Sequence, residues 1–113
     1  MKYLAATLLF VLFADQPRNA PLRVRGVLLT ASWCVPCKQF KREEVARLKR
    51  GRWRVGDDPT DHLQILDYES KAAAGYKVNV LPTFLRIVDG KEVGRREKFL
   101  DALELAEFVY PTK

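Results

Sequence analysis

The chain is poor in the side chains that bind metals or cross-link small proteins. It contains two cysteines and one histidine among 113 residues. Two cysteines cannot form the multiple disulfides that stabilise small secreted domains. A structural zinc site ordinarily takes four Cys or His ligands, which this chain does not have. The composition therefore argues against a disulfide scaffold and against a structural zinc centre.

The sequence also lacks an internal repeat, a nucleic-acid-binding motif and an apolar run of the ~20 residues that cross a bilayer. The net charge is +6, from 20 Lys and Arg against 14 Asp and Glu. A basic balance can indicate nucleic-acid binding. No motif accompanies the charge, which is densest over residues 38–54, so we interpret it as a solvated helix face. We predict no nucleic-acid partner.

The N-terminus has a short basic start and then an uncharged apolar run over residues 3–14. The run has the length of a signal-peptide core and shows neither the period of a strand nor that of a helix. We predict a signal peptide over residues 1–14, a lead-in linker over 15–23, and export to the periplasm or the extracellular space. The chain would then meet the membrane only during export. The alternative is a buried element at the start of the fold, and a chain that keeps residues 1–14 would be cytoplasmic.

The length allows one domain, which we place at residues 24–113. Apolar periodicity and turn residues predict strands at 24–31, 63–67, 83–88 and 91–96, a long helix from Pro36 to Gly51, a short helical turn at 69–74, and a final helix capped by Asp101. Asp89-Gly90 is typical of a two-residue hairpin. Parallel strands joined through helices and followed by a hairpin indicate an α/β fold, with a central mixed sheet flanked by helices.

Two helix faces follow from the same patterns. In the long helix, one face is predicted to carry Cys37, Phe40, Glu44, Val45 and Leu48. In the final helix, the expected core positions are Leu103, Ala106, Phe108 and Val109. Glu43 and Arg47 have the spacing of a favourable ion pair along a helix.

The two cysteines, Cys34 and Cys37, lie three residues apart where the first strand gives way to the long helix. The first turn of a helix presents unpaired N–H groups and the positive end of its dipole. A thiolate at that place is stabilised, which lowers the pKa of the thiol and makes it a better nucleophile. Pro36 suits this first turn because its missing N–H would have no partner there. The spacing therefore favours a reactive pair.

Other interpretations of the cysteine pair remain. A structural disulfide that closes so short a loop constrains the unfolded chain little. A copper site made of Cys34, Cys37 and His62 has suitable ligands, because thiolate and imidazole both bind copper. His62 is otherwise an ordinary loop histidine, and no resident metal is predicted.

Three segments together resemble the thioredoxin family. They are Ser32-Trp33-Cys34-Val35-Pro36-Cys37-Lys38, Leu81-Pro82-Thr83-Phe84 and Asp89-Gly90. The resemblance covers residues 24 to 110. It implies a thioredoxin-like fold and a thiol–disulfide oxidoreductase that exchanges disulfides with protein substrates. It further implies no cofactor, a protein electron donor or acceptor, and a monomer.

The resemblance also implies roles for single residues. Cys34 matches the exposed nucleophile, and Cys37 matches the resolving thiol. Residues at the substrate surface would be Trp33, Val35, Pro36, Leu81 and Pro82. Pro82 matches the family's cis-proline, which would expose the backbone of Leu81 to an extended substrate segment.

The sequence departs from the family pattern at three places. Leu28 occupies the position of a buried acid that often serves the resolving thiol, and Val35 replaces the usual glycine between the cysteines. A glycine expected after the hairpin is replaced near Lys98. Leu28 and Val35 favour an alternative function, a thioredoxin-fold binding module without catalysis. Metal delivery through Cys34, Cys37 and His62 is a further alternative.

Overall fold

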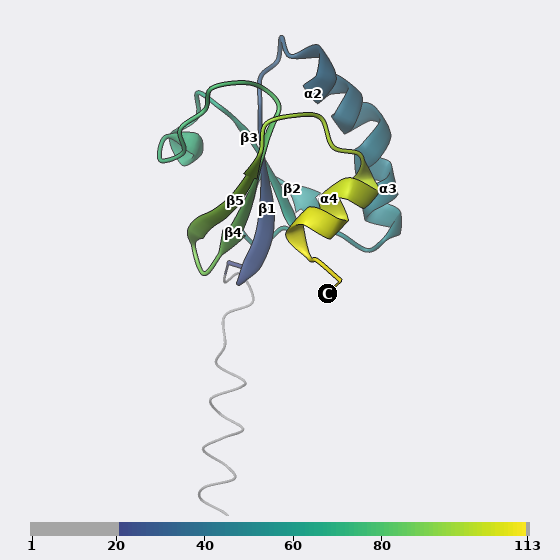
Figure 1. Cartoon of the computed structure of the whole chain (residues 1–113). Helices are drawn as coiled ribbons and strands as arrows, with labels where there is room; N and C mark the ends of the chain where they lie inside the picture. The colour runs from purple at the N-terminus through teal and green to yellow at the C-terminus, as the bar shows by residue number, and fades with distance from the viewer. Residues whose placement is uncertain (1–20, 113) are drawn as a thin grey trace, which may run out of the picture.

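A computed structural model of the chain describes residues 21–112. Its centre is a five-stranded mixed sheet in the order β2-β3-β1-β4-β5 (Figure 1). The strands are β1 (Val24–Thr30), β2 (Val55–Gly56), β3 (Leu63–Asp67), β4 (Thr83–Val88) and β5 (Lys91–Arg96). The four strands of the sequence prediction are present, and β2 is an additional short edge strand. The predicted α/β fold with a mixed sheet is confirmed.

The register of the sheet follows from its connections. The strand β1 runs parallel to β3 and antiparallel to β4, with Leu28 opposite both Ile65 and Phe84. The hairpin between β4 and β5 turns at Asp89 and Gly90, whose φ angles are 50° and 81°. Positive φ at both turn residues gives a hairpin the twist of its strands, and Gly90 adopts it without a steric penalty.

One continuous helical run follows the cysteines. It consists of α2 (Val35–Gln39), the π-helical segment η1 (Phe40–Glu44) and α3 (Val45–Arg50). The predicted buried face is largely confirmed, because Cys37, Phe40, Glu44 and Leu48 are buried and Val45 is half-buried. These helices and α4 (Ala102–Val109) cover one face of the sheet, and the 3-10 turn η2 (Lys71–Ala73) lies on the other side (Figure 1).

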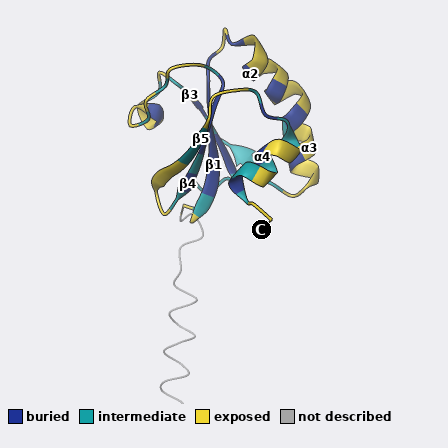
Figure 2. Cartoon of the chain, viewed as in Figure 1, coloured by how far each residue is buried: buried dark blue, intermediate teal, exposed yellow. Residues whose placement is uncertain are grey.

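Alternate residues of β1 therefore pack in two different cores. Leu28 packs with Phe40 and Phe84 beneath the helices. Val27 and Leu29 face the opposite side, where they join Ala73 and the residues that surround it. The buried residues in Figure 2 lie along the sheet and on the helix faces turned toward it.

The predicted ion pair between Glu43 and Arg47 is wrong. Arg47 instead donates to Glu44 at 3.3 Å, three residues away, while Glu43 lies 3.7 Å from Arg42. The reason is the tertiary position of Glu44, which is buried and accepts the N–H of Ala102 at 2.9 Å. A buried carboxylate needs such partners, and Arg47 supplies the nearest charge.

The final helix begins as predicted at Asp101, whose carboxylate caps Glu104 in a reciprocal capping box. Its predicted core is partly wrong, because Leu103 is 83% exposed and Leu105 is buried in its place. Leu105 and Val109 are four residues apart and share the face toward the sheet, whereas Leu103 points about 200° away from Leu105. Val109 is buried as predicted, and Ala106 and Phe108 are half-buried.

Within residues 21–112 the structure contains no helix with the length and apolar character of a bilayer-spanning segment. The predicted signal peptide over residues 1–14 lies outside the described residues.

Candidate redox site

Cys34 and Cys37 form a disulfide whose Cα atoms are 5.2 Å apart. Cys34 is the N-cap residue of α2, and its Sγ accepts a hydrogen bond from the backbone N–H of Cys37 at 3.2 Å. Pro36 lies in the first turn, where a missing N–H leaves nothing unpaired. The predicted placement of both sulfurs at a helix start is what the structure shows. A sulfur there lies next to free N–H groups that stabilise a negative charge.

The two sulfurs differ in their access to solvent. Cys37 is 0% exposed and Cys34 is 4% exposed. The expectation that Cys34 is freely exposed is therefore not met in the disulfide form. Ala31 and the half-buried Tyr68 and Leu81 pack around the pair and cover it. Of the two cysteines, only Cys34 keeps any exposed surface, and that surface is small.

Exposed apolar side chains surround the covered pair. Trp33 is 65% exposed and Val35 is 71% exposed, one on each side of Cys34. Val35 and Pro36 lie on the surface of the first helical turn, as a role in substrate contact requires. The structure thus has a small exposed apolar surface on both sides of Cys34.

A groove of about 210 Å³ lies beside the disulfide. Its lining residues are Trp33, Tyr68, Val78, Asn79, Val80 and Leu81. Small-molecule sites are usually of roughly 300–1,000 Å³, so this groove fits a side chain or a short peptide segment better than a cofactor. Two of the predicted substrate residues, Trp33 and Leu81, are in this lining.

Tyr68 is a groove residue that the sequence prediction missed. Its ring meets that of Trp33 edge to face, with centroids 6.2 Å apart, and its N–H donates to the carbonyl of Thr30 at 2.9 Å. The charge of Glu69 raises the pKa of Tyr68, so the phenol keeps its proton. The position of Tyr68 could have been predicted from the sequence. Tyr68 follows the carboxyl end of β3, and parallel strands end at the same edge of a sheet.

The opposite wall of the groove leads into β4. The peptide bond between Leu81 and Pro82 is cis, as the resemblance implies. Thr83 pairs with Leu29, so the next residue toward the groove, Pro82, is level with Thr30 at the end of β1. The hydroxyl of Thr83 donates to the carbonyl of Val80 at 2.6 Å and anchors this end of the groove wall.

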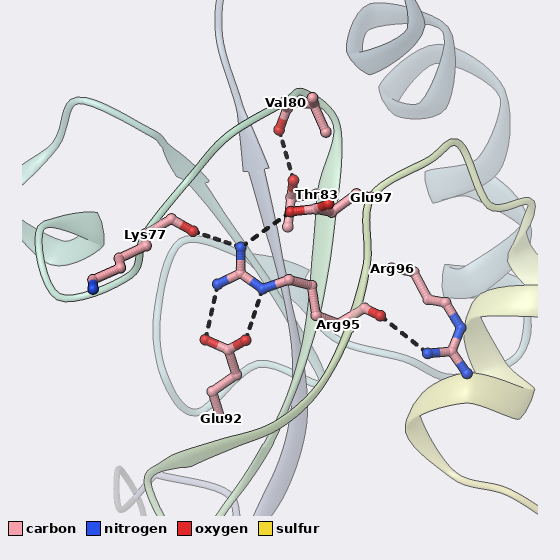
Figure 3. Close-up of polar contacts among 7 residues, drawn as sticks. All are labelled: Lys77, Val80, Thr83, Glu92, Arg95, Arg96 and Glu97. Atoms are coloured by element: carbon pink, nitrogen blue, oxygen red, sulfur yellow. Dashed lines mark hydrogen bonds and ion pairs between the residues drawn. The ribbon is translucent and has the colours of Figure 1, made fainter.

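The other end of the same wall is held by Arg95 on β5 (Figure 3). Its guanidinium donates to the carbonyl of Lys77 at 2.6 Å and to the two carboxylate oxygens of Glu92 at 2.8 and 3.0 Å. A weaker contact of 3.4 Å joins it to Glu97. The hydrogen bonds to Glu92 raise the pKa of Arg95 further, so it stays charged. Sequence reasoning missed this residue.

The structure excludes the copper site built from Cys34, Cys37 and His62. The carbonyl of His62 accepts the N–H of Gly26 near the start of β1, whereas Cys34 follows the end of that strand. The length of β1 therefore separates the imidazole from the sulfurs. Its Nδ1 accepts the N–H of Arg54 at 2.9 Å instead. Across residues 21–112 no group of three Cys, His, Asp or Glu side chains could hold a metal ion.

Comparisons with known proteins agree with this geometry. A thioredoxin from Fasciola hepatica is 29% identical with a TM-score of 0.60, over 96% of this chain and 94% of its own. A thioredoxin from Schistosoma mansoni is 18% identical with a TM-score of 0.59, over 93% and 87%. A thioredoxin variant from Halobacterium salinarum is 22% identical with a TM-score of 0.55, over 77% and 72%.

The chain has the thioredoxin fold. Together with the Cys34–Cys37 disulfide, this is consistent with a thioredoxin-family protein and confirms the resemblance of the sequence. No family profile and no curated protein sequence matches the chain. The thioredoxin-like structure and the cysteine pair support a thiol–disulfide oxidoreductase in general.

Proposed function

We propose that the protein exchanges disulfides with protein substrates through Cys34 and Cys37. The observation that carries this proposal is the disulfide at the start of α2, in which Cys34 is the N-cap residue and Cys37 is fully buried. The groove beside it supports a substrate that is a polypeptide, because its walls are apolar and aromatic and its volume suits a side chain. No cofactor is required.

The exchange proceeds in two balanced steps. In the reduced protein the Cys34 thiolate attacks one sulfur of a substrate disulfide, and the other substrate sulfur leaves as a thiolate and takes a proton from water. The Cys37 thiol then loses its proton to water, and its thiolate attacks Sγ of Cys34. This closes the disulfide seen in the structure and releases the second substrate thiol. The reverse sequence oxidises a substrate dithiol, and the direction depends on the reduction potentials of the pair and its partner.

The arrangement around Cys34 supports its role as the attacking group. The N–H of Cys37 already points at Sγ of Cys34, and the same bond stabilises a thiolate when the disulfide opens. Cys37 is fully buried and can be reached by Cys34 alone, as a resolving thiol requires. A partner protein with thiols or a disulfide completes the cycle.

The test uses Cys34→Ser and Cys37→Ser in an insulin-reduction assay with dithiothreitol as the electron source. Cys34→Ser is expected to lose all turnover, because no other described sulfur is accessible. Cys37→Ser, reduced and then freed of dithiothreitol before insulin is added, is expected to accumulate mixed disulfides that appear on a non-reducing gel. Full activity of Cys34→Ser would contradict the proposal.

One observation favours the binding module without catalysis, namely the 4% exposure of Cys34. Under that alternative the Cys34–Cys37 disulfide never opens, and the groove binds a polypeptide without exchanging disulfides with it. The wild-type protein would then show no turnover, and Cys37→Ser would trap no substrate. The same pair of assays therefore separates the two functions.

We also propose that the chain is exported. The support is the uncharged apolar run over residues 3–14, which ends before polar and proline-bearing sequence. An oxidising compartment outside the cytoplasm is also where disulfide exchange with other proteins is most needed.

A further inference from the structure

The strand β5 contains one extra residue, and this changes which of its side chains share a face of the sheet. Ile87 pairs with Glu92, but the next residue of β4, Arg86, pairs with Gly94. Val93 is therefore a bulge without a partner of its own. In a regular strand, residues three apart lie on opposite faces. The bulge instead places Glu92 and Arg95 on one face, so that they form the two-bonded ion pair.

The bulge also separates Arg95 from its neighbour Arg96. Arg96 pairs with Phe84 on the helix-covered face, where its guanidinium lies 4.5 Å from the ring centre of Phe108. Arg95 pairs with Leu85, which belongs to the core on the opposite face. Figure 3 shows the guanidinium of Arg95 between Glu92 and the backbone of Lys77. An unbulged hairpin would turn Arg95 toward the helices instead.

Three of the six groove residues lie in a segment that is fastened at both of its ends. Arg95 holds the carbonyl of Lys77, and Thr83 holds the carbonyl of Val80. Val78 and Asn79 lie between the two anchored residues, and they line the groove together with Val80. The side chain of Arg95 is only 24% exposed, so water and salt weaken its contacts less than those of a surface pair.

We propose that Arg95 is a positioning residue that determines the affinity of the groove for polypeptide disulfides. It touches neither the sulfurs nor the groove itself, and it acts by holding the wall at Lys77. The inference rests on the proposed function of Cys34 and Cys37. Losing the guanidinium frees one end of the wall, and binding a polypeptide then has to order that segment again. A small disulfide that does not use the wall is reduced as before.

The fork geometry of arginine is needed for this role. A single guanidinium meets both oxygens of Glu92 and the carbonyl of Lys77 at once, which the compact ammonium of lysine does not. Arg95→Lys therefore keeps the charge but loses most of the positioning. Arg95→Gln loses both the charge and the positioning.

The control is Arg23→Gln. Arg23 also forms an ion pair with an acid of the hairpin, Asp89, at 3.2 Å, but both side chains are largely exposed and far from the groove along β4. It reports the effect of removing one positive charge and one surface pair. Turnover of insulin and of bis(2-hydroxyethyl) disulfide is measured for all four proteins.

We expect Arg95→Gln to raise KM for insulin by about fivefold, which is the cost of ordering about one side chain, with kcat changed by less than about twofold. Turnover of the small disulfide stays within about twofold of wild type. Arg95→Lys is intermediate, and Arg23→Gln behaves as wild type. Equal KM in Arg95→Gln and Arg23→Gln overturns the inference, as does an equal loss with both substrates.

A second measurement does not depend on turnover. Trypsin cleaves after lysine, and the carbonyl held by Arg95 belongs to the Lys77–Val78 bond. We expect initial cleavage at this bond to be several-fold faster in Arg95→Gln than in wild type and Arg23→Gln, with cleavage after Lys49 in α3 unchanged. Unchanged cleavage after Lys77 overturns the inference. A wild-type protein without turnover contradicts the proposed function instead, and the cleavage assay still decides the role of Arg95.

Discussion

At the scale of single residues, the buried hydroxyl of Thr30 predicts a change in the stability of the protein. It is the last residue of that strand, and its Oγ1 is buried without a hydrogen-bond partner among residues 21–112. A buried hydroxyl left unpaired costs about 1–3 kcal/mol. Valine has almost the same shape and no hydroxyl. We expect Thr30→Val to raise the free energy of unfolding of the oxidised protein by about 1 kcal/mol, or Tm by about 5 °C.

Thermal unfolding followed by circular dichroism measures this change. Thr30→Ser is the matched control, because it keeps the hydroxyl and removes a buried methyl group. It is expected to lower Tm. A Thr30→Val protein less stable than wild type would show that the hydroxyl has a stabilising partner.

Some features of the residues in the candidate site could be predicted from the sequence, and others could not. The positions of Cys34 and Cys37 were predicted from their chemistry and spacing, which are local features, and Trp33 and Pro82 were predicted from the resemblance to the thioredoxin family. The cover over Cys34 was not, since it comes from Tyr68 and Leu81, which are distant in the chain. Burial of this kind depends on which segments meet, and no local pattern records it.

At the scale of elements, the connection into β3 gives a pH dependence. His62 packs against Trp53 and Tyr110, and its Nδ1 accepts the N–H of Arg54. Partial burial lowers the pKa of His62, and the charge of Arg54 lowers it further. The unfolded chain therefore takes up the proton more readily than the folded one. The contribution of His62 to the free energy of unfolding is fully present above the unfolded pKa of 6.5. It decreases as the pH falls below 6.5, until the pH is below the pKa of His62 in the folded protein.

We expect urea unfolding of the oxidised protein to show a lower midpoint at pH 5 than at pH 7.5. His62→Gln removes the titrating group and should flatten the curve between these values. The cysteines do not contribute in the oxidised form, and the lowered pKa of Asp58 acts at more acidic pH. An equally steep curve in His62→Gln would show that another group carries the effect.

Elements were predicted well where the pattern is local. The strand at residues 83–88, the turn at Asp89-Gly90 and the cap at Asp101 all follow from short-range rules. The helix after the cysteines was predicted as regular, but its middle is π-helical over Phe40–Glu44. The buried carboxylate of Glu44 reaches Ala102 across the fold from this segment, and such a contact leaves no mark on helical periodicity.

At the scale of the whole molecule, export predicts a shorter mature chain. A signal peptidase would remove residues 1–14, and intact-mass spectrometry of protein from the extracytoplasmic fraction would show a chain that begins at Asp15. Leu9→Arg places a charge in the apolar run and should leave the chain unprocessed. Full-length protein in the cytoplasm of the wild type would contradict the prediction.

By itself the sequence determined the order of strands and helices, the cysteine pair at the helix start and the hairpin, because each depends on neighbours within a few residues. The tertiary structure alone decided three other features. They are the cover over Cys34, the distance of His62 from the sulfurs, and the bulge at Val93 that places Arg95 on the same face of β5 as Glu92. Each depends on the register between segments far apart in the chain, where one residue of shift exchanges the two faces of a strand.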